Sequence, residues 1–253
     1  MKTNVISHRG ANFFAPQNTI PAFEKALEIG VDGFETDVHL TKDGVPVLCH
    51  NYTINATSNK KGNITDYTYE ELQKFDFGNY FSPVYKGTKI PTVDEFLALV
   101  AKSDIKILNI ELKSPKEKTE TDLVTKTIDL VKKYDLMGRL IISSFNPELL
   151  VEAKKYDENC KTGLLYSPTK KITWTTIAKD PVGFAKSIGA DALHPYELFV
   201  TKKYVDKAHN AGLMVNPWTV DEPRNIEKML NSSVDSIITN HPDLVNHLIK
   251  IRG

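Results

Sequence analysis

The 253 residues are enough for one large α/β domain, or two smaller ones, with a substantial core. Lysine plus arginine and aspartate plus glutamate each number 32, so the net charge does not favour a nucleic acid or an anionic membrane as a partner. The apolar runs are too short to span a bilayer and the N-terminus lacks the apolar region of a secretory signal, so we expect a cytoplasmic protein without stable membrane insertion.

The two cysteines, Cys49 and Cys160, are isolated in the sequence. They form no CxxC pair and no Cys/His cluster with zinc spacing. We expect two reduced, buried thiols, because a disulfide would need an oxidising compartment for which nothing else argues.

The first part of the chain predicts a βα unit followed by a β-hairpin. The turn Lys42-Asp43-Gly44 reverses the chain between two apolar runs. The predicted elements are strands at 4–7, 34–40 and 45–50, and a helix at 19–29 that Asn18 or Thr19 caps and Gly30 ends.

Residues 51–91 interrupt this alternation. They are rich in Asn, Thr, Tyr and Gly, and contain one short helical pattern at 69–75. We therefore expect a small inserted subdomain after the second strand.

The alternation of strands and helices returns after residue 91. Thr92 and Glu95 form a capping box for a helix that extends to Lys102, and Asn146 caps a helix that Pro147 starts. Further strands are predicted at 105–112, 140–144, 162–166, 190–193, 213–216 and 235–238, and further helices at 118–134, 147–155, 181–188, 202–211, 222–230 and 242–251.

This number of βα units in a chain of this length favours a (β/α)8 TIM barrel over an open doubly wound sheet. No GxGxxG motif or P-loop follows the first strand, which removes the main reason to prefer the open sheet. We expect a single domain over residues 1–253, with 51–91 as the inserted subdomain.

Polar and aromatic residues stand at the carboxyl ends of the predicted strands. In a (β/α)8 barrel the active site lies at that face of the sheet, so their shared location predicts a site. The residues are His8, Arg9, Gly10, Glu35, Asp37, Glu111, Lys113, Ser144, Phe145, Tyr166, His194, Trp218, Asn240 and His241.

Glu35, Asp37 and Glu111 are acids in otherwise apolar strands. Glu35 and Asp37 share one face of their strand, because side chains two apart point the same way. One interpretation is plain ion pairing with Arg9 and Lys113. Three acids facing two cations leave excess negative charge, however, and a divalent ion would balance it. All-carboxylate ligands suit Mg²⁺ or Ca²⁺ rather than zinc.

His8 and His50 each end a strand beside these acids. A lone histidine in such a place is more often structural. Two of them flanking a carboxylate cluster can serve as a base and an acid near neutral pH. The other histidines are weaker candidates or expected structural or surface residues: His39, His194 and His241, and then His209 and His247.

Arg9 and Lys113 are also candidates for holding a phosphate. Arginine offers a planar fork to anionic oxygens, and lysine a point charge. Trp218 and Phe145 would line the pocket, although an aromatic residue near a strand end is as often simple packing.

Several motifs resemble the glycerophosphodiester phosphodiesterase family, in the family's order and over nearly the whole chain. The run ExD…LTKDGxPVxxH is highly specific to it, whereas HRG alone is not. The matching segments are HRG at 8–10, APQNT at 15–19, GFETDVHLTKDGVPVLCHN at 33–51, TxxEL at 68–72, PTVDEF at 91–96, IELK at 110–113, SF at 144–145 and WTV at 218–220.

This resemblance implies a (β/α)8 barrel that hydrolyses a small glycerophosphodiester to glycerol 3-phosphate and an alcohol. It implies one Mg²⁺ or Ca²⁺ ion on the three acids, Glu35, Asp37 and Glu111. His8 and His50 would be the acid/base pair. Arg9 and Lys113 would hold the phosphate, with Trp218 beside the substrate.

Gln17, Asn51 and Ala56 stand where the family usually has other residues. These differences concern rate and substrate choice, and they leave alternatives open. One is a related barrel phosphodiesterase that acts on lysophospholipids or teichoic-acid fragments. The other is a catalytically silent phosphodiester-binding module. For Asn51 itself, an extended backbone predicts a side chain that faces away from His50.

Overall fold

Parallel strands form the centre of the structure, a computed structural model that describes residues 3–113, 121–167, 177 and 179–252. The strands are β1 (Asn4–His8), β2 (Gly33–Leu40), β4 (Ile107–Leu112), β5 (Leu140–Ser144), β6 (Lys161–Tyr166), β7 (Ala192–Pro195), β8 (Met214–Val215) and β9 (Ser236–Thr239). They pair in the order β8-β7-β6-β5-β4-β2-β1-β9, and every pair in this series is parallel.

The two ends of this series meet. The backbone N–H of Asp235 donates to the carbonyl of Val215 at 3.0 Å, and that of Ile238 donates to Pro217 at 3.0 Å. These bonds join the segment after β8 to β9. The sheet therefore closes on itself, and the predicted (β/α)8 barrel is confirmed.

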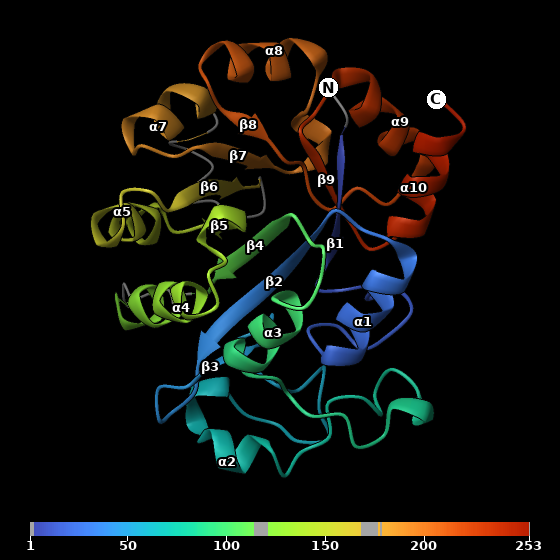
Figure 1. The fold of residues 1–253 in the computed structure, drawn as a ribbon, viewed down its shortest axis with the longest axis vertical. Helices are drawn as coiled ribbons and strands as arrows, with labels where there is room; N and C mark the ends of the chain where they lie inside the picture. Colours follow the sequence, from blue (N-terminus) through green and yellow to red (C-terminus); the bar gives the residue numbers. More distant parts are fainter. Residues whose placement is uncertain (1–2, 114–120, 168–176, 178, 253) are drawn as a thin grey trace.

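Helices alternate with the strands and surround the barrel (Figure 1). The α-helices outside the insertion are α1 (Ile20–Ile29), α3 (Val93–Val100), α4 (Thr121–Lys133), α5 (Pro147–Tyr156), α7 (Pro181–Ser187), α8 (Lys202–Asn210), α9 (Pro223–Ser232) and α10 (Pro242–Lys250). Short 3-10 helices occur at η1 (Ile64–Asp66), η2 (Pro83–Tyr85), η3 (Met137–Arg139) and η4 (Glu197–Phe199). The first residues of the helix predicted at 118–134 lie outside the described residues.

The predicted caps at Thr92, Asn146 and Gly30 are confirmed. Thr92 Oγ1 accepts from the N–H of Glu95 at 3.0 Å, while the N–H of Thr92 donates to Glu95 Oε2 at 2.8 Å. Asn146 Oδ1 accepts from the N–H of Glu148 at 3.0 Å. Gly30 ends α1 with φ 81°, a conformation that favours glycine. These local signals let the helix boundaries be predicted from sequence.

Side chains along β2 point alternately toward the hydrophobic core and into the barrel. Phe34 points outward, where its ring centroid lies 5.2 Å from Phe23 and 6.0 Å from Phe96. These rings belong to the main hydrophobic core between strands and helices. Glu35 and Asp37 therefore point to the opposite face, into the barrel.

A short strand, β3 (Pro46–Leu48), pairs antiparallel with β2 and leads into residues 51–91. Gly44 makes the turn between these strands with φ 75°. Figure 1 places the following segment, with α2 (Tyr69–Leu72), at the opposite end of the molecule from α8. It has a second hydrophobic cluster, formed by Val47, Cys49, Ile54, Ile64, Leu72, Phe77 and Ile90.

Both cysteines are buried and free, as expected. Burial raises the pKa of each thiol to about 12. Within the described part of the chain, no helix combines the length and apolar character that crossing a membrane requires.

Candidate active site

Glu35, Asp37 and Glu111 come together inside the barrel, at the carboxyl ends of β2 and β4. Asp37 and Glu111 are partners in the β2–β4 pairing. One carboxylate oxygen from each of the three residues lies within 4.8 Å of the other two. All three side chains are buried. This arrangement confirms the predicted proximity of the three acids, and it can hold one metal ion among them.

The electrostatics of the cluster are unfavourable without another cation. Burial and the charge of Asp37 raise the pKa of Glu35 well above its ordinary value. Burial likewise raises the pKa of Glu111 to about 7, with Asp37 contributing. Burial also opposes ionisation of Asp37, but Lys113 and Arg9 hold its pKa below the usual range. The charged forms of Glu35 and Glu111 are therefore unfavourable here, and a bound divalent ion would stabilise them.

Lys113 and Arg9 supply the positive charge that the cluster has. Lys113 Nζ lies 2.9 Å from Asp37 Oδ1 and 2.5 Å from Glu111 Oε1, and Arg9 Nε lies 3.2 Å from Asp37 Oδ2. The ion pairs considered from the sequence thus exist. They still leave three carboxylates facing two cations.

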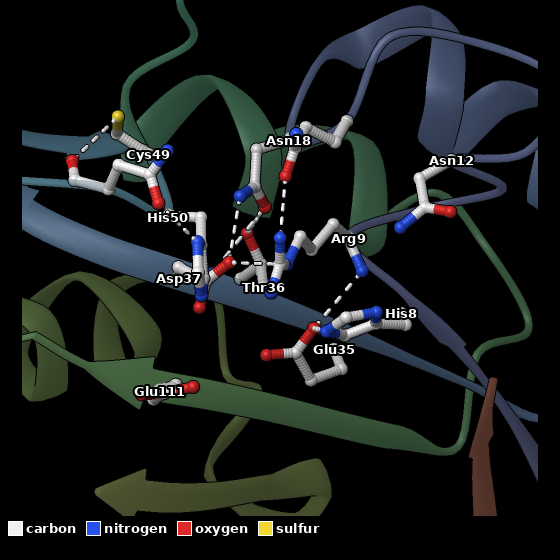
Figure 2. Close-up of polar contacts among 12 residues, drawn as sticks. His8, Arg9, Asn12, Asn18, Glu35, Thr36, Asp37, Cys49, His50 and Glu111 are labelled. Atoms are coloured by element: carbon white, nitrogen blue, oxygen red, sulfur yellow. Dashed lines mark hydrogen bonds and ion pairs between the residues drawn. The ribbon is translucent and has the colours of Figure 1, made fainter. Parts of the chain in front are cut away.

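The turn after β1 places Arg9 against these acids (Figure 2). Arg9 has a positive φ of 58°, and its N–H lies 3.0 Å from Glu35 Oε2. Its Nη1 donates to Gln17 Oε1 at 2.7 Å. Gly10 follows with φ 76°, and a Cβ there would lie 2.7 Å from Ala22. The glycine of the HRG motif is therefore required by the close approach of α1.

His8, the last residue of β1, lies beside Glu35 (Figure 2). Its Nε2 lies 3.9 Å from Glu35 Oε2, and its Nδ1 lies 2.7 Å from Asn240 Oδ1. Burial and the neighbouring charge of Arg9 lower the pKa of His8 to about 3. The ring is therefore neutral at physiological pH.

His50 reaches the cluster because the β2–β3 hairpin folds back over β2. The N–H of Cys49 donates to the carbonyl of Asp37 at 3.0 Å, which fixes the chain next to the acids. Burial and the charges of Lys113 and Arg9 lower the pKa of His50 to about 4. His50 is thus a second neutral imidazole at this site.

The prediction that Asn51 faces away from His50 is wrong. Asn51 Oδ1 lies 2.8 Å from His50 Nδ1. The prediction assumed extended backbone, but β3 ends at Leu48 and the chain bends at His50. Adjacent side chains at such a bend can turn toward one another.

Other strand-end candidates have structural surroundings. His194 lies within β7, where it is 3.1 Å from Asn216, and a Cβ on Gly163 would come 2.5 Å from its Nε2. The strand predicted at 190–193 is shifted by two residues, because the turn after α7 extends through Gly189 and Ala190. Tyr166 bonds to Tyr204 through their hydroxyls in the hydrophobic core, so it is not a site residue.

Of the remaining histidines, His39, His209 and His241 contact other groups, and His247 is exposed, as expected. His39 Nε2 lies 3.4 Å from the carbonyl of His50, and the ring of His241 is 4.2 Å from that of Phe13. His209 lies 2.8 Å from Asp235, so this helix residue is half-buried in an ion pair rather than simply exposed.

Trp218 and Phe145 pack edge to face, with ring centroids 5.4 Å apart. Trp218 Nε1 donates to the carbonyl of His194 at 2.8 Å, which holds the indole at the carboxyl end of the barrel. Both side chains are half-buried. They form an aromatic wall on the side of β8 and β5.

Asn18 contacts the acid cluster, whereas the sequence indicates it only as a possible helix cap and as part of the APQNT segment. Its Nδ2 donates to Asp37 Oδ2 at 2.9 Å, and its Oδ1 accepts from Thr36 Oγ1 at 2.8 Å. Thr19 takes the capping position instead. Asn18 has φ 55°, a left-handed conformation that asparagine tolerates better than most residues. The choice of asparagine at this position is the sequence feature that fits this conformation.

Comparison with known proteins agrees with this geometry. The sequence matches the glycerophosphoryl diester phosphodiesterase family over residues 8–244. It is 38% identical to a glycerophosphodiester phosphodiesterase from Caldanaerobacter subterraneus subsp. tengcongensis, covering 100% of both chains. A Bacillus altitudinis glycerophosphodiester phosphodiesterase is 33% identical, over 99% of this chain and 98% of that one.

A similar fold has been solved with a ligand. An Oleispira antarctica phosphodiesterase, in complex with the product sn-glycerol-3-phosphate, superposes with a TM-score of 0.88 at 27% identity. The match covers 98% of this chain and 96% of that chain. The two chains therefore share the barrel over nearly their whole length.

Proposed function

The chain belongs to the glycerophosphoryl diester phosphodiesterase family and is a phosphodiesterase, and we propose that it hydrolyses glycerophosphodiesters to glycerol 3-phosphate and an alcohol. The observation that carries this proposal is the buried cluster of Glu35, Asp37 and Glu111 with two cations and two neutral histidines around it. The product named in the Oleispira antarctica complex supports the choice of substrate.

Glu35, Asp37 and Glu111 would hold one divalent cation, Mg²⁺ or Ca²⁺. Their donor set is all oxygen, which suits these hard ions, and the raised pKa values of Glu35 and Glu111 fit a site that gains stability from a cation. When bound, the ion would neutralise a non-bridging phosphate oxygen and stabilise charge that builds at phosphorus.

Arg9 and Lys113 would bind the phosphate group. Arg9 is anchored at Nε by Asp37 and at Nη1 by Gln17, so its guanidinium is held in one orientation. Lys113 lies between two carboxylates, which raise its pKa despite burial and keep the ammonium charged. Both cations would orient the diester for attack.

His8 and His50 would transfer the protons. One neutral imidazole would take the proton of the attacking hydroxyl, either of water or of the glycerol 2-position. The other would deliver a proton to the oxygen of the departing alcohol as its bond to phosphorus breaks.

We propose further that the enzyme is a single cytoplasmic barrel domain with residues 51–91 as an inserted subdomain. Its buried free thiols support a reducing compartment. The insertion begins directly after His50 and has its own apolar cluster, which suits a segment that shapes the alcohol side of the site. Trp218 would contact the substrate from the opposite wall.

Exposed apolar side chains favour a second candidate, a lysophospholipid substrate. Phe13 is 58% and Val84 81% exposed. Their loops are tied together, because Tyr80 Oη lies 3.2 Å from the N–H of Gln17 and Tyr85 Oη donates to the carbonyl of Phe14 at 3.0 Å. This surface next to Arg9 could receive an acyl chain.

The test is product analysis on matched substrates. Glycerophosphocholine, glycerophosphoethanolamine and lysophosphatidylcholine would each be incubated with enzyme and Mg²⁺ or Ca²⁺, with glycerol 3-phosphate and free choline measured separately. The proposal predicts glycerol 3-phosphate from the first two. Choline release from lysophosphatidylcholine alone would favour the second candidate. Tight binding of all three without turnover would identify a silent binding module.

A further inference from the structure

Asn240, directly after β9, is held by a carboxylate from the neighbouring loop. Its side-chain Nδ2 donates to Asp221 Oδ2 at 2.6 Å, and its backbone N–H donates to Asp221 Oδ1 at 2.8 Å. Thr239 Oγ1 also donates to Asp221 Oδ1, at 3.1 Å. A carboxylate only accepts hydrogen bonds, so the amide nitrogen of Asn240 must be the group that faces Asp221.

The oxygen of the same amide therefore faces His8. Asn240 Oδ1 lies 2.7 Å from His8 Nδ1 and accepts from Asn12 Nδ2, also at 2.7 Å. These two contacts use both lone pairs of the amide oxygen. Because this oxygen can only accept, His8 Nδ1 must carry a hydrogen. In the neutral ring, Nε2 is then the nitrogen without one.

We infer that Asn240, oriented by Asp221, is a positioning residue that keeps the hydrogen of His8 on Nδ1 and directs Nε2 toward the reacting phosphodiester. This inference rests on the proposed function, in which His8 transfers a proton. Nε2 is the nitrogen on the side of Glu35, at 3.9 Å from its carboxylate. The chain Asp221–Asn240–His8 thus sets which nitrogen of His8 exchanges the proton.

While Asp221 is present, the side chain at position 240 must donate to its carboxylate and accept from His8, and an amide does both. Aspartate would place a second carboxylate against Asp221 across a 2.6 Å contact. Leucine would leave His8 Nδ1 without its acceptor. The double variant Asp221→Asn/Asn240→Asp, however, keeps the shapes of both side chains. It exchanges the donor and the acceptor between positions 221 and 240. It still offers an acceptor to His8.

The first test reads the tautomer without requiring activity. Two-bond ¹H–¹⁵N correlation spectra of histidine-labelled, metal-free protein at pH 8 distinguish Nδ1–H from Nε2–H rings, with His8 assigned from the His8→Gln variant. The inference predicts Nδ1–H for His8 in wild type and loss of that preference in Asn240→Leu. Asn246→Leu is the matched control, since Asn246 bonds only the carbonyls of Ile29 and Gly30 among the described contacts. An Nε2–H ring in wild type, or an unchanged His8 signal in Asn240→Leu, would overturn the inference.

The second test uses rescue. With glycerophosphocholine, Asn240→Asp should lower kcat by about 10–100-fold with little change in KM, because repulsion from Asp221 would displace the side chain that orients His8. The double variant should recover most of that loss, and Asp221→Asn alone completes the cycle. A double variant no better than Asn240→Asp would contradict the inference. An inactive wild type whose His8 is the Nδ1–H tautomer would refute the proposed function but not the placement of the hydrogen.

Discussion

Asp37 and Glu111 are direct partners across β2 and β4, so their carboxylates enter the barrel side by side. Lys113 Nζ contacts both, at 2.9 and 2.5 Å. Parallel pairing in register therefore creates a concentration of negative charge that one lysine balances only in part. A divalent cation shared by these carboxylates would balance the remaining negative charge.

Glu35→Gln should weaken metal affinity and activity together. The loss in kcat/KM should be about 10²–10³-fold, as expected when a fixed electrostatic contact is removed from an active site. Calorimetric titration with Mg²⁺ and Ca²⁺ would measure the affinity. In metal-free protein the same variant should be at least as stable as wild type, because burial and Asp37 already disfavour the charged form of Glu35. Unchanged metal affinity would remove Glu35 from the ligand set.

His8→Ala and His50→Ala should each lower kcat by about 10²–10⁴-fold, the usual worth of a positioned proton-transfer group. The double variant should lose much less than the product of the two, since the groups act in one reaction. Steady-state rates at saturating metal would provide the measurement. Two strictly multiplicative losses would argue against paired acid and base roles.

Asn51→Asp should shift the limb of the pH–rate profile that reports His50 to higher pH. The pKa of His50 is lowered to about 4, chiefly by burial. A carboxylate placed 2.8 Å from Nδ1 would stabilise the charged ring and raise that pKa. The measurement is kcat/KM as a function of pH for wild type and Asn51→Asp. Superimposable curves would show that the contact between residue 51 and His50 has no electrostatic role.

His194→Gln should make the stability of the protein less sensitive to acid. Burial lowers the pKa of His194 to about 3, so below pH 6.5 the unfolded chain binds a proton that the folded chain excludes. The free energy of unfolding therefore decreases as the pH falls from 6.5 toward 3, by up to about 1.4 kcal/mol per pH unit. Urea unfolding at pH 7 and pH 5 would measure the drop, and an equal drop in the variant would contradict the prediction.

Local patterns predicted much of the fold. Three features that depend only on neighbours in the sequence have the predicted geometry. They are the shared face of Glu35 and Asp37, the capping box of Thr92 and the helix end at Gly30. The regular alternation of strands and helices also predicted the (β/α)8 barrel. Such features need no knowledge of distant contacts.

Contacts between distant segments could not be predicted in the same way. Asn240 meets His8 across 232 positions, and nothing near either residue indicates the pairing. The local sequence indicates Asn18 or Thr19 as a cap, whereas the bond from Asn18 to Asp37 forms only when α1 packs on β2. Asn51 was misplaced for a local reason, since the bend after β3 has no clear sequence signal.

We propose that hydrolysis needs a divalent ion held by Glu35, Asp37 and Glu111. The most direct measurement is glycerol 3-phosphate release from glycerophosphocholine by enzyme stripped of metal, verified by elemental analysis, before and after adding Mg²⁺ or Ca²⁺. We expect negligible turnover in the stripped enzyme and recovery on adding one of the ions, with no recovery in Glu35→Gln at the same concentration. Full turnover by the verified metal-free enzyme in excess chelator would contradict this proposal.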